Sequence, residues 1–248
     1  MQAMSGVFSS RDDARRALAA LGSIGVPDTK ASLLTPGDMS KQSEWIRFDA
    51  AESAGTGKGQ PVLMSAFLPG VGWVTGAGPL AIAILRAAGA RIDAAAGGSP
   101  KDALVEALPE DEIFVYEDAL RDGRSVVIAM ADDATAEPIR KSLLERGAEA
   151  TDAQRQQWWM ELRDLEREHY SASGRSFTQD EKFYRLGFEA ALHARTRCME
   201  FDQVSAEMDS RLEDLEQQYP DAEIEEPFTR GYRRGREYFQ ALCDERAA

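Results

Sequence analysis

The chain has 248 residues, of which 43% are hydrophobic and 29% are charged, a composition typical of a globular protein and not of a disordered or fibrous one. Its length predicts two domains. The net charge of −14 disfavours nucleic acid and anionic membranes as partners, because both carry the same sign of charge.

The cysteines and the N-terminus indicate a cytoplasmic protein. Cys198 and Cys243 lack the spacing of a metal site and give no disulfide framework, as is typical of a reducing compartment. Residues 1–16 lack the basic start and apolar core of a secretory signal. We therefore expect a cytoplasmic location.

The N-terminal part predicts a β-α-β unit. Residues 5–9 form a short apolar run typical of a strand, and Ser10 with Asp13 predicts the start of a helix. Apolar residues then recur at the helical spacing of three and four: Ala14, Ala17, Leu18, Leu21 and Ile24. Residues 30–35 predict a second strand.

A second β-α-β pattern follows much later. Residues 124–130 predict a strand, and a helical stripe of Ile139, Leu143 and Leu144 ends at Gly147. Residues 148–152 then predict an extended segment. Two such halves predict an α+β domain over residues 1–151, with a ferredoxin-like sheet, both helices on one face, and a long insertion over residues 36–122.

The insertion is too long to be a simple loop and must contain structure of its own. We expect a short strand at residues 45–48 and a helix that opens at Ser99 and Pro100. A further helix is predicted within residues 109–123, where it stops at Gly123.

The uncharged stretch from residue 59 to residue 85 allows several interpretations. It is long enough to span a membrane, but Pro69, Pro79 and four glycines interrupt it, which argues against membrane insertion. An apolar strand, a glycine loop over residues 69–78 and a buried helix explain it better. The glycines of this loop are Gly70, Gly72, Gly76 and Gly78.

Neither nucleotide-binding pattern in this region is complete. GTGKG at residues 55–59 resembles the end of a phosphate loop, but Glu52 and Gly59 occupy the positions of the required glycine and hydroxyl. GAGPLA at residues 76–81 matches the looser dinucleotide pattern without a ribose-binding acid about 20 residues later. The amides of a helix that starts near Pro79 still give a possible anion site.

Residues 152–248 predict an all-helical domain of about four helices. One stripe combines Trp158, Leu162 and Leu165, and Thr178 with Glu181 predicts a capping box for the next helix. The remaining stripes are Phe183, Leu186 and Ala190; Val204, Met208, Leu212 and Leu215; and Phe228, Tyr232, Phe239 and Leu242. Pro220 separates the third helix from the fourth.

Two features of these helices suggest chemistry. Glu166 and His169 have the E-x-x-H spacing of di-metal bundles, and Glu189 lies one turn from His193, but a surface array of ion pairs explains these residues better. The basic stretch at residues 230–236 follows an acidic one that can neutralise it, so we expect no nucleic acid partner.

Two motifs share one pattern: a small residue, an aromatic residue directly after it, and a second small residue four positions after the first small residue. They comprise Gly187, Phe188 and Ala191, and Gly231, Tyr232 and Gly235. Because small residues four apart let two helices approach closely, we expect these helices to contact each other, with a role in packing first and in interaction by extension.

Three stretches resemble the YflT-like family of heat-induced general stress proteins: VFSSRDDARRALAALGSIGVP, LPGVGWVTGAGPLA and LPEDEIFVYEDALRDGRSVVIAMADDATAEPIRKSLLERGA. The resemblance covers residues 5–150 and implies a stress-associated protein with no catalytic residues to carry over. Where a longer run of glycine and alanine is expected, this chain has Arg86, Arg91 and Asp93, which argues further against a membrane role. The helical part is similar to extensions with a G-[FY]-x-x-[GA] element.

We therefore expect a non-catalytic, stress-associated binding or interaction protein without a cofactor, whose partner is another protein or a second copy. An alternative is a ligand-sensing module that binds an anionic metabolite at the loop over residues 69–78. A second alternative is a metal-dependent enzyme that uses Glu166, His169, Glu189 and His193.

Overall fold

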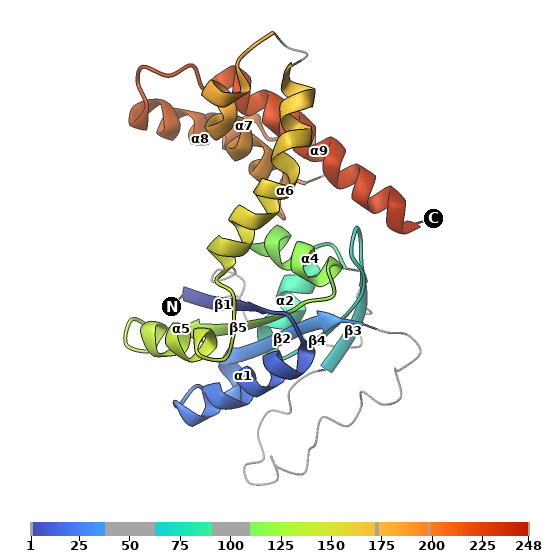
Figure 1. Cartoon of the computed structure of the whole chain (residues 1–248), viewed down its shortest axis with the longest axis vertical. Coiled ribbons are helices and arrows are strands. Elements are labelled where there is room, and N and C mark those ends of the chain that lie inside the picture. Colours follow the sequence, from blue (N-terminus) through green and yellow to red (C-terminus); the bar gives the residue numbers. More distant parts are fainter. Residues whose placement is uncertain (1, 38–62, 91–109, 172–173, 198, 248) are drawn as a thin grey trace. The chain divides into compact units, whose positions relative to one another are not determined.

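The computed structural model describes residues 2–37, 63–90, 110–171, 174–197 and 199–247 (Figure 1). The expected strand at residues 45–48, the GTGKG stretch, the helix at Ser99 and Pro100, and Cys198 lie outside them. The chain divides into two compact units, which are Met1–Pro109 with Val115–Arg155, and Glu110–Phe114 with Gln156–Ala248.

The first β-α-β unit forms as the sequence predicts. Strand β1 (Gln2–Phe8) leads into helix α1 (Arg11–Ser23), and a short 3-10 helix, η1 (Asp28–Lys30), precedes strand β2 (Ala31–Pro36). The backbone N–H of Asp13 donates to the Ser10 hydroxyl over 3.1 Å. This bond confirms Ser10 as the N-cap of α1.

Strands β3 (Leu63–Leu68) and β4 (Gly72–Ala77) form a hairpin, and helix α2 (Pro79–Ala87) follows directly. The expected glycine loop over residues 69–78 is therefore wrong for most of its length. The last four residues of β4 are all buried, and the absence of a side chain at Gly76 leaves room for the helix that packs on this strand.

The second half of the sheet unit comprises helix α4 (Ile113–Arg121), strand β5 (Ser125–Ala131) and helix α5 (Ala136–Leu144). The extended segment expected at residues 148–152 is wrong in part. Only Glu149 forms a bridge, to Val7, and helix α6 starts at Thr151. The residues after Thr151 favour a helix, and Asp152 in the first turn stabilises its N-terminus, so α6 begins at Thr151.

The fold is α+β, with one five-stranded antiparallel sheet of order β1-β5-β2-β4-β3. Strands β1 and β2 each pair with β5 in antiparallel fashion, as in the registers Val7↔Val126 and Leu33↔Val127. These two strands therefore run parallel, with β5 between them. Figure 1 shows helices on both faces of this sheet.

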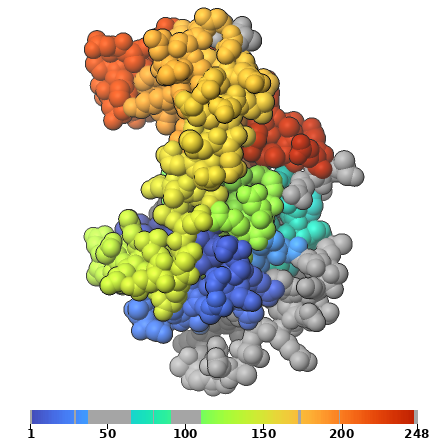
Figure 2. All heavy atoms as spheres, viewed as in Figure 1, coloured from blue at the N-terminus to red at the C-terminus, as the bar shows by residue number. Residues whose placement is uncertain are grey.

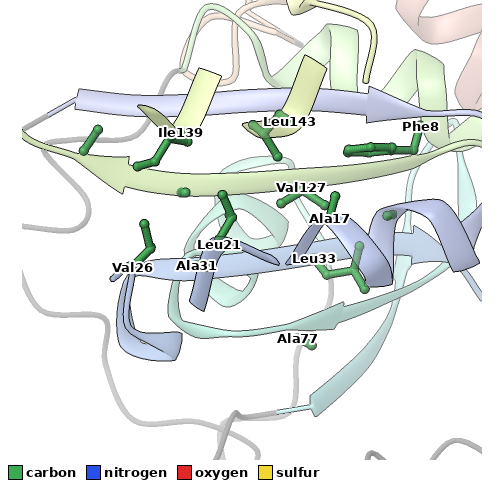
Figure 3. Packing of buried hydrophobic residues seen from close by; sticks show 13 residues of the cluster. Phe8, Ala17, Leu21, Val26, Ala31, Leu33, Ala77, Val127, Ile139 and Leu143 are labelled. Atoms are coloured by element: carbon green, nitrogen blue, oxygen red, sulfur yellow. The ribbon is translucent and has the colours of Figure 1, made fainter. Parts of the chain in front are cut away.

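Helices α1 and α5 share one core on one face of the sheet. Leu21 of α1 and Ile139 and Leu143 of α5 are buried against Leu33 and Val127, as Figure 3 shows. In the space-filling view (Figure 2), α1 and α5 lie side by side. Full burial of such a side chain contributes about 1.5–3 kcal/mol to folding.

Helix α2 covers the other face, over β2, β4 and β3. A Cβ added to Gly76 would lie closer than 3.0 Å to the Cβ of Ala81, so the glycine permits this close approach. The backbone N–H of Leu80, in the first turn of α2, donates to the buried Ser32 hydroxyl over 2.9 Å.

The C-terminal part of the chain contains the helices α6 (Thr151–Ser171), α7 (Phe177–Leu192), the 3-10 helix η4 (Phe201–Gln203), α8 (Ser205–Gln218) and α9 (Glu225–Ala247). The capping box expected at Thr178 is wrong, because α7 already begins at Phe177. The Glu181 carboxylate accepts instead from Arg163 and Trp159. Among the described residues, no helix combines the length and apolarity needed to cross a membrane.

We predict that Gly78→Ala lowers the free energy of unfolding by about 3 kcal/mol. Gly78 has a φ of +96°, and an added Cβ would lie closer than 3.0 Å to the Ala31 carbonyl and the Ser32 hydroxyl. The control is Gly22→Ala in α1, where an added Cβ meets nothing within 4 Å, so stability should stay level or rise by up to about 1 kcal/mol. Urea unfolding measures both, and equal midpoints would contradict this account.

Candidate functional site

A fully buried carboxylate lies at the centre of the helical unit. Glu166 on α6 has 0% of its side chain exposed. Its Oε2 accepts hydrogen bonds from the Tyr184 hydroxyl on α7, over 2.8 Å, and from Nε of Arg234 on α9, over 3.1 Å. Its Oε1 is buried and has no donor among the described residues. These three residues are called the polar trio below.

The polar trio combines an ion pair and a hydrogen bond around a buried carboxylate. Burial and the neighbouring Glu166 carboxylate raise the pKa of the Tyr184 hydroxyl well above its ordinary value. Tyr184 therefore stays protonated and donates to Glu166. Arg234 also pairs with Glu237, over 3.4 Å, and supplies the positive charge that a buried carboxylate requires.

The expected surface position of Glu166 is wrong. The buried face of α6 passes through Trp158 and Trp159 and then through Glu166 and Tyr170, whereas Leu165, which was expected in the buried stripe, is 49% exposed. Trp159 fixes this orientation, because it packs on the rings of α7 and turns Leu165 to solvent. A hydrophobic pattern alone could not show that a glutamate shares the buried face.

The four residues of the metal hypothesis do not come together. Glu166 belongs to the polar trio, His169 is exposed, and Glu189 pairs with Arg185 over 2.6 Å. His193 is the C-cap of α7. Within the described ranges, no three residues of the types His, Cys, Asp and Glu form a group that could hold a metal ion.

The two small-residue motifs lie against each other where α7 meets α9. A Cβ added to Gly187 would lie closer than 3.0 Å to the Phe228 carbonyl oxygen, and one added to Gly231 equally close to that of Tyr184. Gly235 likewise faces Phe188 and Ala191. The Tyr232 hydroxyl, at the same crossing, donates to the Thr196 carbonyl over 3.2 Å. Backbone therefore contacts backbone, as small residues permit.

The basic stretch at residues 230–236 is largely paired with carboxylates. Arg230 pairs with Glu226, and Arg236 pairs with both carboxylate oxygens of Glu200. Arg234 belongs to the polar trio. The acidic stretch named in the sequence supplies only Glu226, so most of the neutralising groups come from elsewhere in the unit.

A second buried network was missed by sequence reasoning. Asp180, in the first turn of α7, accepts from the Tyr170 hydroxyl over 2.6 Å and from Nε of Arg175 over 2.8 Å. Burial and the Asp180 carboxylate raise the pKa of Tyr170 to about 12. Arg175 also pairs with Glu226 over 2.6 Å. An acidic residue in the first turn of α7 was the one available signal.

The four glycines of the ligand hypothesis divide between the two ends of β4. Gly70 and Gly72 lie at the hairpin turn, where the Gly70 carbonyl accepts from Nε of Arg121 over 2.9 Å. Gly76 and Gly78 lie at the end that leads into α2. Three residues of strand lie between Gly72 and Gly76, which are about 13 Å apart at the rise of a strand, so the four glycines do not line one loop.

The β3–β4 hairpin presents an exposed aromatic pair. Phe67 and Trp73 are register partners on the two strands, with ring centroids 6.0 Å apart. They are 37% and 39% exposed. An aromatic cross-strand pair of this kind stabilises a hairpin and also offers a contact surface.

In comparisons with known proteins, no family model, no curated protein and no solved structure matches the chain.

We predict that Gly231→Ala lowers the free energy of unfolding by about 3 kcal/mol or more, because the added Cβ has no space beside the Tyr184 carbonyl. The control is Arg233→Ala, an exposed site on the same helix, which should change stability by less than about 0.5 kcal/mol. Urea unfolding followed by circular dichroism measures both. A Gly231 variant as stable as its control would refute the close crossing.

We predict a pH-dependent stability that depends on His193. Burial lowers the pKa of His193, and Arg211 lowers it further against the opposing carboxylates of Glu110, Glu207 and Asp111. The unfolded chain takes up this proton near the ordinary value of 6.5, so stability falls as the pH falls below that value.

The measurement is the free energy of unfolding at about pH 7.5 and about pH 5.5. His193→Gln should reduce the loss between these values by about 1 kcal/mol, whereas His169→Gln, at the exposed histidine, should leave it unchanged. An equal loss in the two variants would contradict the assignment.

Proposed function

We propose that the protein is a non-catalytic binding protein of the cytoplasm that acts in a stress response by contact with another protein. The resemblance of residues 5–150 to heat-induced general stress proteins supports the stress setting. The observation that carries the binding role is a difference between the two edges of the sheet.

The β1 edge is covered over part of its length. Val7 and Glu149 exchange two backbone hydrogen bonds, of 3.0 and 2.8 Å, and the hydroxyls of Ser5 and Thr151 meet over 2.5 Å. Exposed strand edges attract further strands, and proteins generally block them. This edge is therefore closed to an incoming strand over part of its length.

Within the part of the chain that the structure describes, no such protection covers the β3 edge. Among the described residues β3 pairs with β4 alone, and residues 63–78 carry no charge in a chain of net charge −14. Phe67 and Trp73 are exposed on this hairpin. An uncharged edge with exposed aromatic side chains favours strand addition.

The occupant we propose is an extended, neutral or basic segment of another protein. A second copy of the chain brings a further charge of −14, so repulsion opposes self-association. The negative charge of the chain attracts a basic segment, and the exposed ring of Trp73 can bind its cations through a cation–π interaction.

We also propose a ferredoxin-like core for the sheet unit. Strand β5 lies between β1 and β2, and Glu149 bridges to the outer side of β1. The bridge at Glu149 then corresponds to the fourth strand, reduced to one residue, and the β3–β4 hairpin extends the sheet beside β2.

The test is site-specific photo-crosslinking in intact cells. We expect a photoreactive phenylalanine derivative in place of Phe67 to crosslink another protein with a yield about tenfold above that of the same derivative at Leu144, which is 48% exposed on α5. Adding Ser65→Lys, which places a charge on the β3 edge, should abolish the Phe67 product.

Two results would contradict the proposal. Equal yields at Phe67 and Leu144 would show that the hairpin is no special surface. If the derivative at Phe67 crosslinked only to a second copy of the chain, the hairpin would be a surface for self-association and not for another protein.

A further inference from the structure

The backbone of β3 points hydrogen-bonding groups outward at defined residues. In an antiparallel pair, two opposed residues either bond to each other or both point their backbone groups away from the pair. The Trp73 carbonyl accepts from the Gly37 N–H over 2.6 Å, on the β2 side of β4, so it points away from β3. Its register partner Phe67 therefore points its own N–H and carbonyl toward the β3 edge, and so does Ser65, two residues earlier.

The side chains of the same two residues are exposed on one face of the sheet. Successive side chains of a strand point to opposite faces, so Ser65 and Phe67 share a face and Ala66 and Leu68 share the other. Ser65 and Phe67 are both exposed. Ala66 and Leu68 are buried on the face that α2 covers. An incoming strand therefore meets free backbone groups and exposed side chains at the same two residues.

The side chains on the exposed face are arranged in rows of similar chemistry. Thr35 of β2, Thr75 of β4 and Ser65 of β3 are register neighbours, and the hydroxyls of Ser65 and Thr75 lie 3.1 Å apart. Beside this hydroxyl row, Phe67 and Trp73 form an aromatic row. Cross-strand pairs of both kinds stabilise a sheet. Both rows reach the β3 edge, where a further strand would continue them.

We propose that the β3 edge recognises a strand in which an aromatic residue is followed, two positions later, by serine or threonine. This inference rests on the proposed binding function. Every strand pair of the sheet is antiparallel. Antiparallel addition places the aromatic residue opposite Phe67 and the hydroxyl residue opposite Ser65.

The residue between these two lies opposite Ala66, on the face that α2 covers, so it is small and apolar. Backbone hydrogen bonds to the edge supply affinity, and the side-chain pairs supply selectivity, as in other cases of strand addition.

The test is the binding of two synthetic peptides to the full chain, measured by fluorescence anisotropy. The first has the core Val-Tyr-Ala-Thr-Val between paired lysines, and the second has the same composition with the core Val-Thr-Ala-Tyr-Val. We expect the first peptide to bind at least about threefold more tightly, because it alone continues both rows in the antiparallel orientation. Equal affinities, or tighter binding of the second peptide, would overturn the proposal.

Two variants of the chain test the hydroxyl row. Ser65→Val removes the hydroxyl and keeps a residue that favours a strand, so it should reduce the preference for the first peptide. Leu144→Ala, at an exposed site on α5, should leave this preference unchanged. A preference of the same size in both variants would show that the hydroxyl row plays no part in recognition.

The outcomes also separate this inference from the proposed function. If neither peptide binds while the derivative at Phe67 still crosslinks another protein in cells, the recognition pattern is wrong and the binding role stands. Equal crosslinking at Phe67 and Leu144 would instead contradict the binding role itself.

Discussion

Close approach between backbones, possible only where a residue lacks Cβ, positions the helices in both units. In the sheet unit, Gly76 and Gly78 let α2 lie against β2 and β4. In the helical unit, Gly187 and Gly231 let α7 and α9 touch through their backbones. A side chain at these positions would move a helix and the residues it carries, so the buried polar trio and the sheet core depend on the same steric constraint.

The sequence predicted those features that depend on short-range patterns. Ser10 caps α1 because its hydroxyl lies within reach of an amide three residues later, and the α+β class follows from two separated β-α-β patterns. Strand β4 escaped prediction because Gly76, in the middle of the GAG sequence, serves packing and not a turn. The burial of Glu166 was not predicted because the charged residues beside it in the sequence make its helix face look exposed. Its partners Tyr184 and Arg234 are also distant in sequence.

The two units use charge in opposite ways. The β3–β4 hairpin lies in a stretch of 16 residues, 63–78, without a charge, on a chain whose net charge of −14 repels its own copies. The helical unit buries the Glu166 carboxylate and pairs it with Arg234. An uncharged strand edge favours contact with a further strand, whereas a buried carboxylate requires a paired cation.

The close crossing of α7 and α9 is tested most directly by nuclear Overhauser effects in the labelled protein. An added Cβ on Gly231 would lie 3.0 Å from the Phe188 nitrogen, and an added Cβ on Gly187 would lie 3.0 Å from the Phe228 Cα. In each glycine an Hα proton points in the direction of this Cβ, so it lies close to the same atom. We predict cross-peaks from Gly231 Hα to the Phe188 amide proton and from Gly187 Hα to Phe228 Hα. Their absence, in a spectrum that contains the Phe183–Tyr219 ring contact, would contradict the account.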